Sequence, residues 1–356
     1  MKIEKIVIFI IILITLIFSG CQEEYFAKLD KVEPLLVVQG MITNQPGPYL
    51  ISLSLSWRFQ EPPVFNALSG AIVSISANDA TNVNLVELSP GSYYTPAGFI
   101  GEVGKEYTLQ ILTPDGHKYT SSPQEILPPL NIDSIYGTKS EKVFYRPSSV
   151  SNTLFATNVP GAYAFINTSN SDNNSSRFRF ASELYVQYGV PISDTAVDNC
   201  WIKKPITGFQ PTDLGFFSNL DGASQEVGFV PLLSNGIPFL GFPPSLLYDQ
   251  VRVIINKVLT LNEESYNFHK AKNDQLNSAG RILDPIAAQL PGNIQCISDP
   301  DKLTLGFFEA CAETILTYRV ITTLTQQTVD IIHLPAMNNI PNEGCLTNQY
   351  PPFWVN

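Results

Sequence analysis

Cys21 is the residue whose surroundings most clearly indicate a chemical modification. Met1–Lys5 carry two lysines against one glutamate, Ile6–Phe18 form an apolar run, and Ser19-Gly20 place small side chains directly before the cysteine. This order predicts a secretory leader over residues 1–20 and a lipid on the Cys21 thiol. The apolar run of thirteen residues is shorter than the roughly 18–20 residues of a membrane-spanning helix. The alternative is an ordinary signal peptide with a chance cysteine, or an uncleaved anchor.

An acidic pair follows the predicted lipid attachment point. Gln22, Glu23 and Glu24 come directly after Cys21, and this arrangement resembles the surface-export signal of lipoproteins in Bacteroidetes-type bacteria. Acyl chains hold a protein at a bilayer through about 0.8 kcal/mol per buried methylene group. We therefore expect an outer-membrane protein that is anchored in the bilayer through Cys21 and faces the cell exterior. The alternative is that the two glutamates are ordinary residues of a tether and that the protein faces the periplasm.

Four further cysteines could form disulfides, bind a metal or react. These are Cys200, Cys296, Cys311 and Cys345. An even number in an exported chain allows disulfides with three different pairings, and the sequence leaves the pairing open. Because no two of the four have C-x-x-C spacing, we expect structural bridges or buried thiols, and neither a metal site nor a cofactor.

The remaining candidates for catalysis form no recognisable pattern. His117, His269 and His333 are far apart, and the chain has no H-E-x-x-H motif and no G-x-S-x-G nucleophile elbow. Each histidine is predicted to be a surface or packing residue. Three carboxylates could supply a glycosidase pair if folding brought two of them together: Glu183, Asp249 and Glu309. Unpaired surface acids are the simpler expectation, so we predict no catalytic residues and no enzymatic activity.

Composition favours an exported β protein. The chain of 356 residues has 27 prolines, 15 tyrosines and 21 phenylalanines, and only 15% of its residues are charged. Its formal net charge of −11 disfavours nucleic acid and anionic lipid as partners, because both would repel it.

Period-two alternation of apolar and polar residues predicts a mainly β fold. It is clear in Ile51–Trp57 and Tyr107–Ile111, and Pro114-Asp115-Gly116 is a tight-turn signal. Some seven short strands predict an immunoglobulin-like or transthyretin-like sandwich over residues 35–127, after a lipidated tether at 21–34. The proline-bearing stretch Ser121–Asn131 predicts a linker. Residues 128–356 would then form a larger, β-rich second domain.

One short helix is expected in this second domain. Thr260-Leu261-Asn262-Glu263 fits a capping box, in which the Thr260 hydroxyl accepts a backbone N–H and Glu263 reaches back to the cap. The helix is predicted over about residues 261–278, after a strand at Val251–Val258.

An aromatic segment is the candidate partner surface. Pro205–Pro244 is rich in Gly, Pro and Phe and carries few charges, as the centre of a protein interface does. We single out Phe216, Phe217 and Phe239 as contact residues. The alternative is that these side chains pack into the core of their own domain.

The motifs together resemble a known family. The resembling segments are Leu35–Gly40, Leu261–His269, Pro291–Ile294, Asp299-Pro300, Leu305–Phe308 and Pro352–Trp354. They are similar to the domain of unknown function 4249 family, outer-membrane lipoproteins of Bacteroidetes-type bacteria whose genes typically neighbour TonB-dependent receptors. Two departures are a missing tryptophan in Phe178–Tyr188 and a single Cys345 where relatives often carry a pair. Physically, Gly292-Asn293 predicts a tight turn with positive φ, and Leu305–Phe308 predicts a buried strand.

Two classes of function follow from these observations. The resemblance and the anchor imply a non-enzymatic accessory subunit that binds at a TonB-dependent transporter. A surface hydrolase acting on glycan or peptide is the alternative, and an adhesin or scaffold without a link to transport is another.

Overall fold

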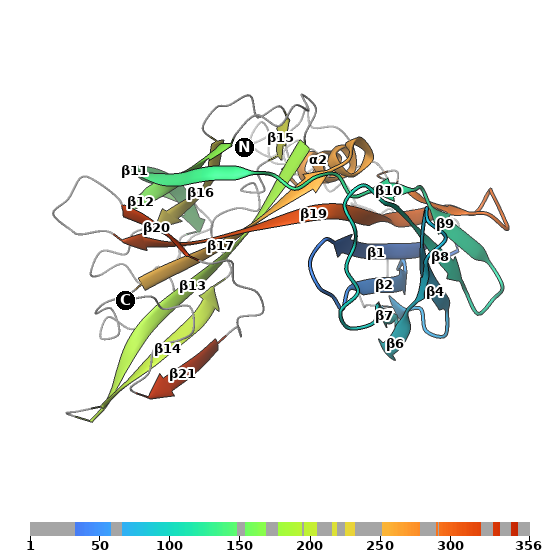
Figure 1. Cartoon of the computed structure of the whole chain (residues 1–356), viewed down its shortest axis with the longest axis horizontal. Helices are drawn as coiled ribbons and strands as arrows, with labels where there is room; N and C mark the ends of the chain where they lie inside the picture. Colours follow the sequence, from blue (N-terminus) through green and yellow to red (C-terminus); the bar gives the residue numbers. More distant parts are fainter. Residues whose placement is uncertain are drawn as a thin grey trace, which may run out of the picture.

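The computed structural model describes residues 33–57, 66–147, 154–168, 177–193, 196–204, 216–218, 225–231, 251–277, 290, 292–321, 330–334 and 343–347. Figure 1 shows them as two β bodies. Strands predominate, and α2 (Glu263–Asn277) is the one helix in these ranges, which confirms the predicted mainly β class with one short helix. Within the same ranges, no helix is long and apolar enough to cross a membrane.

The N-terminal body is a sandwich of two sheets. Val38 and Leu53 from one sheet and Val73 and Leu109 from the other are buried in a shared core, because alternate side chains of each strand point inward. The strands of the first sheet are β1 (Leu36–Thr43), β2 (Leu50–Leu55), β3 (Asn66–Ala67), β6 (Val86–Ser89) and β7 (Ser92–Tyr94). Those of the second are β4 (Ile72–Ala77), β5 (Asn82–Asn84), β8 (Glu106–Leu112), β9 (Lys118–Ser121), β10 (Gln124–Glu125) and β18 (Ile294–Cys296).

β19 (Thr304–Ile321) belongs to both bodies, as Figure 1 shows. Its first half runs parallel to β1, with Gly306 opposite Val38. Its second half runs antiparallel to β17 (Val251–Leu261), so one twelve-stranded sheet passes from the sandwich into the second body.

The sandwich is not complete at residue 127. β18 pairs with β9, and the first half of β19 pairs with β1. The boundary predicted between residues 127 and 128 therefore does not separate the sheets, because residues 294–296 and 304–311 pair with the N-terminal body. Pairing between segments so distant in sequence leaves no trace in local alternation.

Close backbone approach explains two glycines near this junction. Gly306 has a φ of 95°, and a Cβ there would lie 1.8 Å from the Val38 carbonyl oxygen. A Cβ on Gly292 would lie 1.9 Å from the Gly306 carbonyl oxygen. The positive φ expected at Gly292-Asn293 is found instead at Gly306, where the chain passes between two neighbouring backbones. Leu305–Phe308 is part of β19, as predicted for a strand.

The second body is built around β13 (Arg177–Ser193). This strand pairs with β14, β15 and β17, and a three-stranded sheet of β11, β12 and β16 packs beside it. Phe178 and Phe180 of β13 share a core with Ile166 of β12 and Tyr318 of β19. The other strands are β11 (Ile132–Pro147), β12 (Leu154–Thr168), β14 (Ala196–Lys204), β15 (Phe216–Ser218), β16 (Gln225–Pro231), β20 (Asp330–Leu334) and β21 (Glu343–Thr347).

Two of the four cysteines are joined and two are free. Cys200 of β14 lies opposite Cys345 of β21, and the two form a disulfide. Cys296 and Cys311 are buried free thiols. Of the outcomes that the sequence left open, the structure has one bridge, which fastens the edge strand β21 to β14, and two buried thiols.

A side-chain network attaches the N-terminus of α2 to the sandwich. Asn262 caps the helix, since its Oδ1 accepts the Ser265 N–H at 2.8 Å. The predicted cap, Thr260, lies in β17, which continues to Leu261, so the helix begins later than the capping box implied. Gln124 of β10 is fully buried, and its Oε1 accepts from Asn262 Nδ2 at 2.8 Å and from Ser265 Oγ at 3.1 Å.

Candidate functional site

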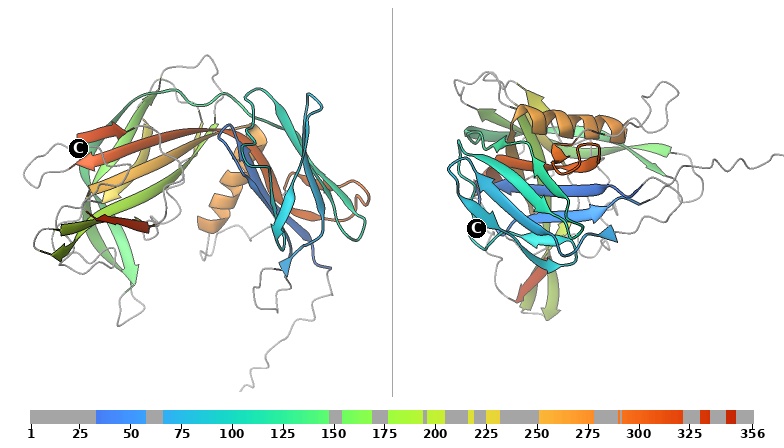
Figure 2. Two further views of the ribbon diagram at one scale, coloured as in Figure 1. Left: turned by 60° about the horizontal axis from the view of Figure 1, so that its bottom comes forward. Right: turned by 90° about the vertical axis from the view of Figure 1, so that its right-hand side faces the viewer.

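α2 lies in the angle between the two bodies, as the left view of Figure 2 shows. β19 sends three side chains into the sandwich core: Phe308, Ala310 and Ala312. Because side chains alternate along a strand, Phe307, Glu309 and Cys311 face the other side. There Phe268 of α2 stacks on Phe307 with ring centroids 4.6 Å apart, and Tyr266 packs in one cluster with Cys311.

A buried ion cluster joins three elements on this face. The Glu309 side chain of β19 is only 3% exposed. Its Oε1 lies 3.1 Å from Arg179 Nη2 of β13, and its Oε2 is in contact with His269 Nε2 of α2. Both carboxylate oxygens therefore have a partner, and each partner comes from a different element.

The electrostatics of the cluster disfavour acid–base chemistry. Burial alone would raise the pKa of Glu309, but attraction to Arg179 and the hydrogen bond with His269 outweigh it and lower the pKa to about 2. A base with so low a pKa is weak at neutral pH. Burial, reinforced by the charge on Glu309, raises the pKa of the neighbouring Cys311 thiol well above its ordinary value, so this cysteine is not a ready nucleophile.

A groove of about 350 Å³ opens beside the cluster. Met41 of β1 and Leu50 of β2 contribute apolar surface, together with Phe268 and Phe307. Lys272 of α2 also lines the groove, together with Arg179, His269 and Glu309. An apolar wall with a few converging polar groups is the usual make-up of a ligand site, and such sites often lie between domains.

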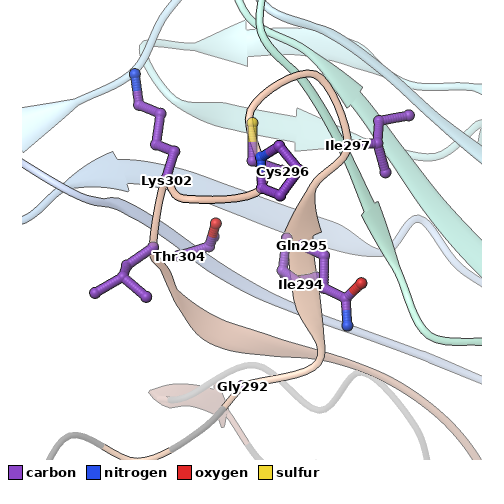
Figure 3. A pocket seen from close by; sticks show the side chains of 9 residues that line it. Gly292, Ile294, Gln295, Cys296, Ile297, Lys302 and Thr304 are labelled. Carbon is purple, nitrogen blue, oxygen red and sulfur yellow. The ribbon is translucent and has the colours of Figure 1, made fainter.

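A second hollow, of about 640 Å³, lies at the connection between β18 and β19. Figure 3 shows Ile294 and Ile297 on the β18 side of this connection and Lys302 and Thr304 on the β19 side. The buried Cys296 thiol also lines it. The described part of its lining has one ammonium group and no acid or histidine, so this hollow offers less chemistry than the groove.

A serine, a histidine and an aspartate meet on the sandwich surface in a loose arrangement. Ser298 Oγ lies 3.4 Å from His117 Nδ1, and His117 Nε2 lies 3.7 Å from Asp115 Oδ2. A nucleophile and its base need about 2.6–3.2 Å. The Ser298 oxygen also accepts the Lys118 N–H at 3.0 Å, and Ser298 and Asp115 are exposed, so we interpret the contact as part of a surface turn.

The carboxylates named from the sequence do not form a pair. Glu183 of β13 lies opposite Ile255, which lies opposite Thr317, eight residues along β19 from Glu309. At about 3.3 Å per residue this is more than 20 Å, whereas glycosidase carboxylates lie about 5–9.5 Å apart. Glu183 instead pairs with Lys203 at 2.8 Å. Asp249 lies outside the described residues.

The other predicted site residues are only partly within the described ranges. Phe216 and Phe217 are in β15, which pairs with β13 opposite Phe178 and Arg179. Cys21, Gln22, Glu23, Glu24 and Phe239 lie outside the described residues.

The ion cluster was not predicted from the sequence, because the spacing of its three residues along the chain gives no signal. His269 was predicted to be isolated, and Glu309 was considered only as half of a carboxylate pair. The three members lie 130 and 40 residues apart along the chain. The one local sign was the alternation of Phe307 and Glu309 within β19, which a surface acid would also produce.

Comparison with known proteins gives one match. The family model described as "Domain of unknown function (DUF4249)" matches residues 22–316. No curated protein and no solved structure is significantly similar to the chain. The match includes the sandwich, the groove and the whole ion cluster. The protein is therefore a member of the DUF4249 family.

Proposed function

We propose that the protein is a lipid-anchored, surface-exposed binding subunit without catalytic activity, and that it acts beside a TonB-dependent transporter in the outer membrane. The observation that carries this proposal is the state of Glu309. Its two oxygens are already occupied by Arg179 and His269, so the groove presents a fixed recognition surface in place of a free acid, base or nucleophile.

The anchor and the shared strand support the same role. The leader that ends at Cys21 places the body next to a membrane, where a binding subunit meets its transporter. β19 is hydrogen-bonded to both bodies, so the sandwich and the groove keep fixed relative positions. A docking subunit needs this geometry because ordering two loosely linked bodies would cost conformational entropy on binding.

We assign contact with the transporter to the aromatic segment Pro205–Pro244. β15 places its Phe216 and Phe217 alongside β13, and the segment's low charge suits an interface centre. Serine at Phe216, Phe217 or Phe239, introduced singly, should abolish co-purification without changing the melting temperature. Ile192→Ser, at a 54% exposed apolar position of β13 outside this segment, is the matched control. A fall in melting temperature for all three phenylalanine variants would mean that they are core residues and would refute this assignment.

Affinity purification tests the proposed partner. The tagged full-length chain is recovered from detergent-solubilised outer membranes, and co-purifying proteins are identified by mass spectrometry. We expect a TonB-dependent transporter among them, and we expect Cys21→Ala to leave an unprocessed or unanchored protein that no longer recovers it. Recovery of the intact, membrane-bound chain without any transporter would contradict the proposal. Hydrolysis of glycan or peptide that Glu309→Gln abolishes would contradict the non-enzymatic part.

A further inference from the structure

The groove beside α2 has more hydrogen-bond donors and positive charge than its own acceptors use. Among the described residues Glu309 is the one acid in its lining, and Arg179 and His269 already engage it. Lys272 makes no ion pair with any residue that the structure describes. The Arg179 Nε is buried and has no hydrogen-bond partner within that part of the chain. The groove therefore carries a local positive excess in a chain whose net charge is −11.

The groove lining also has an apolar part. Phe268 and Phe307 stack with ring centroids 4.6 Å apart and planes inclined by 23°. Leu50 lines the same groove and is 42% exposed, which is high for a leucine. Aromatic faces and an exposed leucine provide a surface that a flat or branched apolar group can cover.

Lys272 is positioned to meet the charged end of a ligand. It follows Phe268 by four residues and His269 by three, so all three side chains share one face of α2. An ammonium group is a compact point charge on a flexible stem, and it can reach a carboxylate at the rim while its methylenes cover apolar surface. Gln39 of β1 also lines the groove and is exposed, so its amide can donate to the same group.

We propose that this groove binds an organic carboxylate with an apolar body. The apolar body lies against Phe268, Phe307 and Leu50, and the carboxylate is held by Lys272 and Gln39. The inference rests on the proposed binding role of the groove, but it does not depend on which transporter is the partner. A free carboxylic acid and the C-terminus of a peptide share this chemistry, and two probes distinguish them.

Calorimetric titration of the full-length chain in zwitterionic lipid nanodiscs tests the proposal, with empty nanodiscs as the blank. The probes are 3-phenylpropionate for a free acid and the tripeptide Ala-Ala-Phe for a peptide C-terminus. Each is compared with the primary amide in which the same carboxylate is replaced. We expect at least one carboxylate to bind and its amide to bind about ten- to a hundredfold more weakly, because a hydrogen-bonded charge is lost. The tighter of the two carboxylates identifies the source. Equal affinity for acid and amide, or no binding of either acid in the millimolar range, would overturn the proposal.

Two lysine variants locate the site. Lys272→Gln should weaken carboxylate binding by about ten- to a hundredfold. Lys270→Gln removes the same charge from an exposed position on α2 that does not line the groove, and it should bind normally. Equal effects of both variants, or no effect of Lys272→Gln at an unchanged melting temperature, would refute the assignment.

Co-purification of the transporter should be unchanged in Lys272→Gln. If calorimetry shows carboxylate binding but no transporter co-purifies, only the proposed partner is contradicted. If a transporter co-purifies but neither carboxylate binds, only this inference is contradicted.

Discussion

Asn293 completes the edge of β19 with its side chain. Its Nδ2 donates to the Phe308 carbonyl oxygen at 2.8 Å, and its Oδ1 accepts the Phe308 N–H at 2.9 Å. A primary amide carries one donor side and one acceptor side, so it can replace one residue of a neighbouring strand. All four groups are buried, and the strand they complete is the one that both bodies share.

Asn293→Ala should destabilise the protein because the Phe308 N–H and carbonyl oxygen lose their partners. A buried polar group left without a hydrogen bond costs about 1–3 kcal/mol. Denaturant unfolding monitored by circular dichroism measures the loss. Gln295→Ala, at an exposed position of β18 two residues away, should change the free energy of unfolding by less than about 0.5 kcal/mol. Equal stability of the two variants would show that the amide contacts do not matter.

Gly306→Ala and Gly98→Ala separate backbone strain from backbone contact. Both glycines have positive φ, 95° and 83°, so alanine at either position costs of order 1 kcal/mol. Only at Gly306 would the new Cβ meet another atom, the Val38 carbonyl oxygen at 1.8 Å, while Gly98 has nothing within 4 Å. We expect a much larger loss of stability for Gly306→Ala, or no folded protein. Similar melting temperatures for the two variants would disprove the close approach of β1 and β19.

The ion cluster should make stability depend on acidic pH. Folding lowers the pKa of Glu309 from 4.5 to about 2. A carboxyl group with a lowered pKa stabilises the fold above its unfolded pKa, and this stability is lost as the pH falls through the folded pKa. The wild-type chain should therefore lose roughly 3 kcal/mol between about pH 5 and pH 2 through this group.

Glu309→Gln should remove most of that pH dependence, as guanidinium unfolding between pH 2 and pH 7 can show. The variant should also be less stable at pH 7, because Arg179 loses its buried counter-ion. Glu125→Gln removes an exposed charge from β10 and should leave the acid profile unchanged. A Glu309→Gln profile parallel to that of the wild type would argue against the cluster.

The disulfide should stabilise the fold mainly by restricting the unfolded chain. Cys200 and Cys345 are 145 residues apart, and removing a native bridge typically costs about 2–5 kcal/mol. The Cys200→Ser, Cys345→Ser double variant should lose this amount, and reductant should lower the melting temperature of the wild type but not of the variant. Mass spectrometry after thiol labelling should find the label on Cys200 and Cys345 only when the protein has been reduced. A mixed bridge involving Cys296 or Cys311 would contradict the pairing.

The sequence alone determined those features that depend on residues close together along the chain. The order of charge, apolar run, small residues and cysteine predicts the leader and the anchor at Cys21. Period-two alternation predicts a strand over Ile51–Trp57, and the structure has β2 there, ending at Leu55. The helix after Leu261 was predicted with nearly correct bounds, although Asn262 caps it and Thr260 does not. In each case the signal lies within a short segment, about one or two helical turns or a single strand. Over such a length, local backbone geometry sets the period with which side chains point to one face.

Only the tertiary structure decided the boundary of the sandwich, the bridge and the site. β1 and β19 pair although most of the chain lies between them, and parallel pairing at such a distance has no local period. The same holds for Cys200 with Cys345 and for Arg179 with Glu309 and His269. Burial then determined the chemical environment of Glu309. An acid that the sequence alone would place in solvent became a fully engaged carboxylate, because folding put a guanidinium and an imidazole on its two oxygens and left its side chain only 3% exposed.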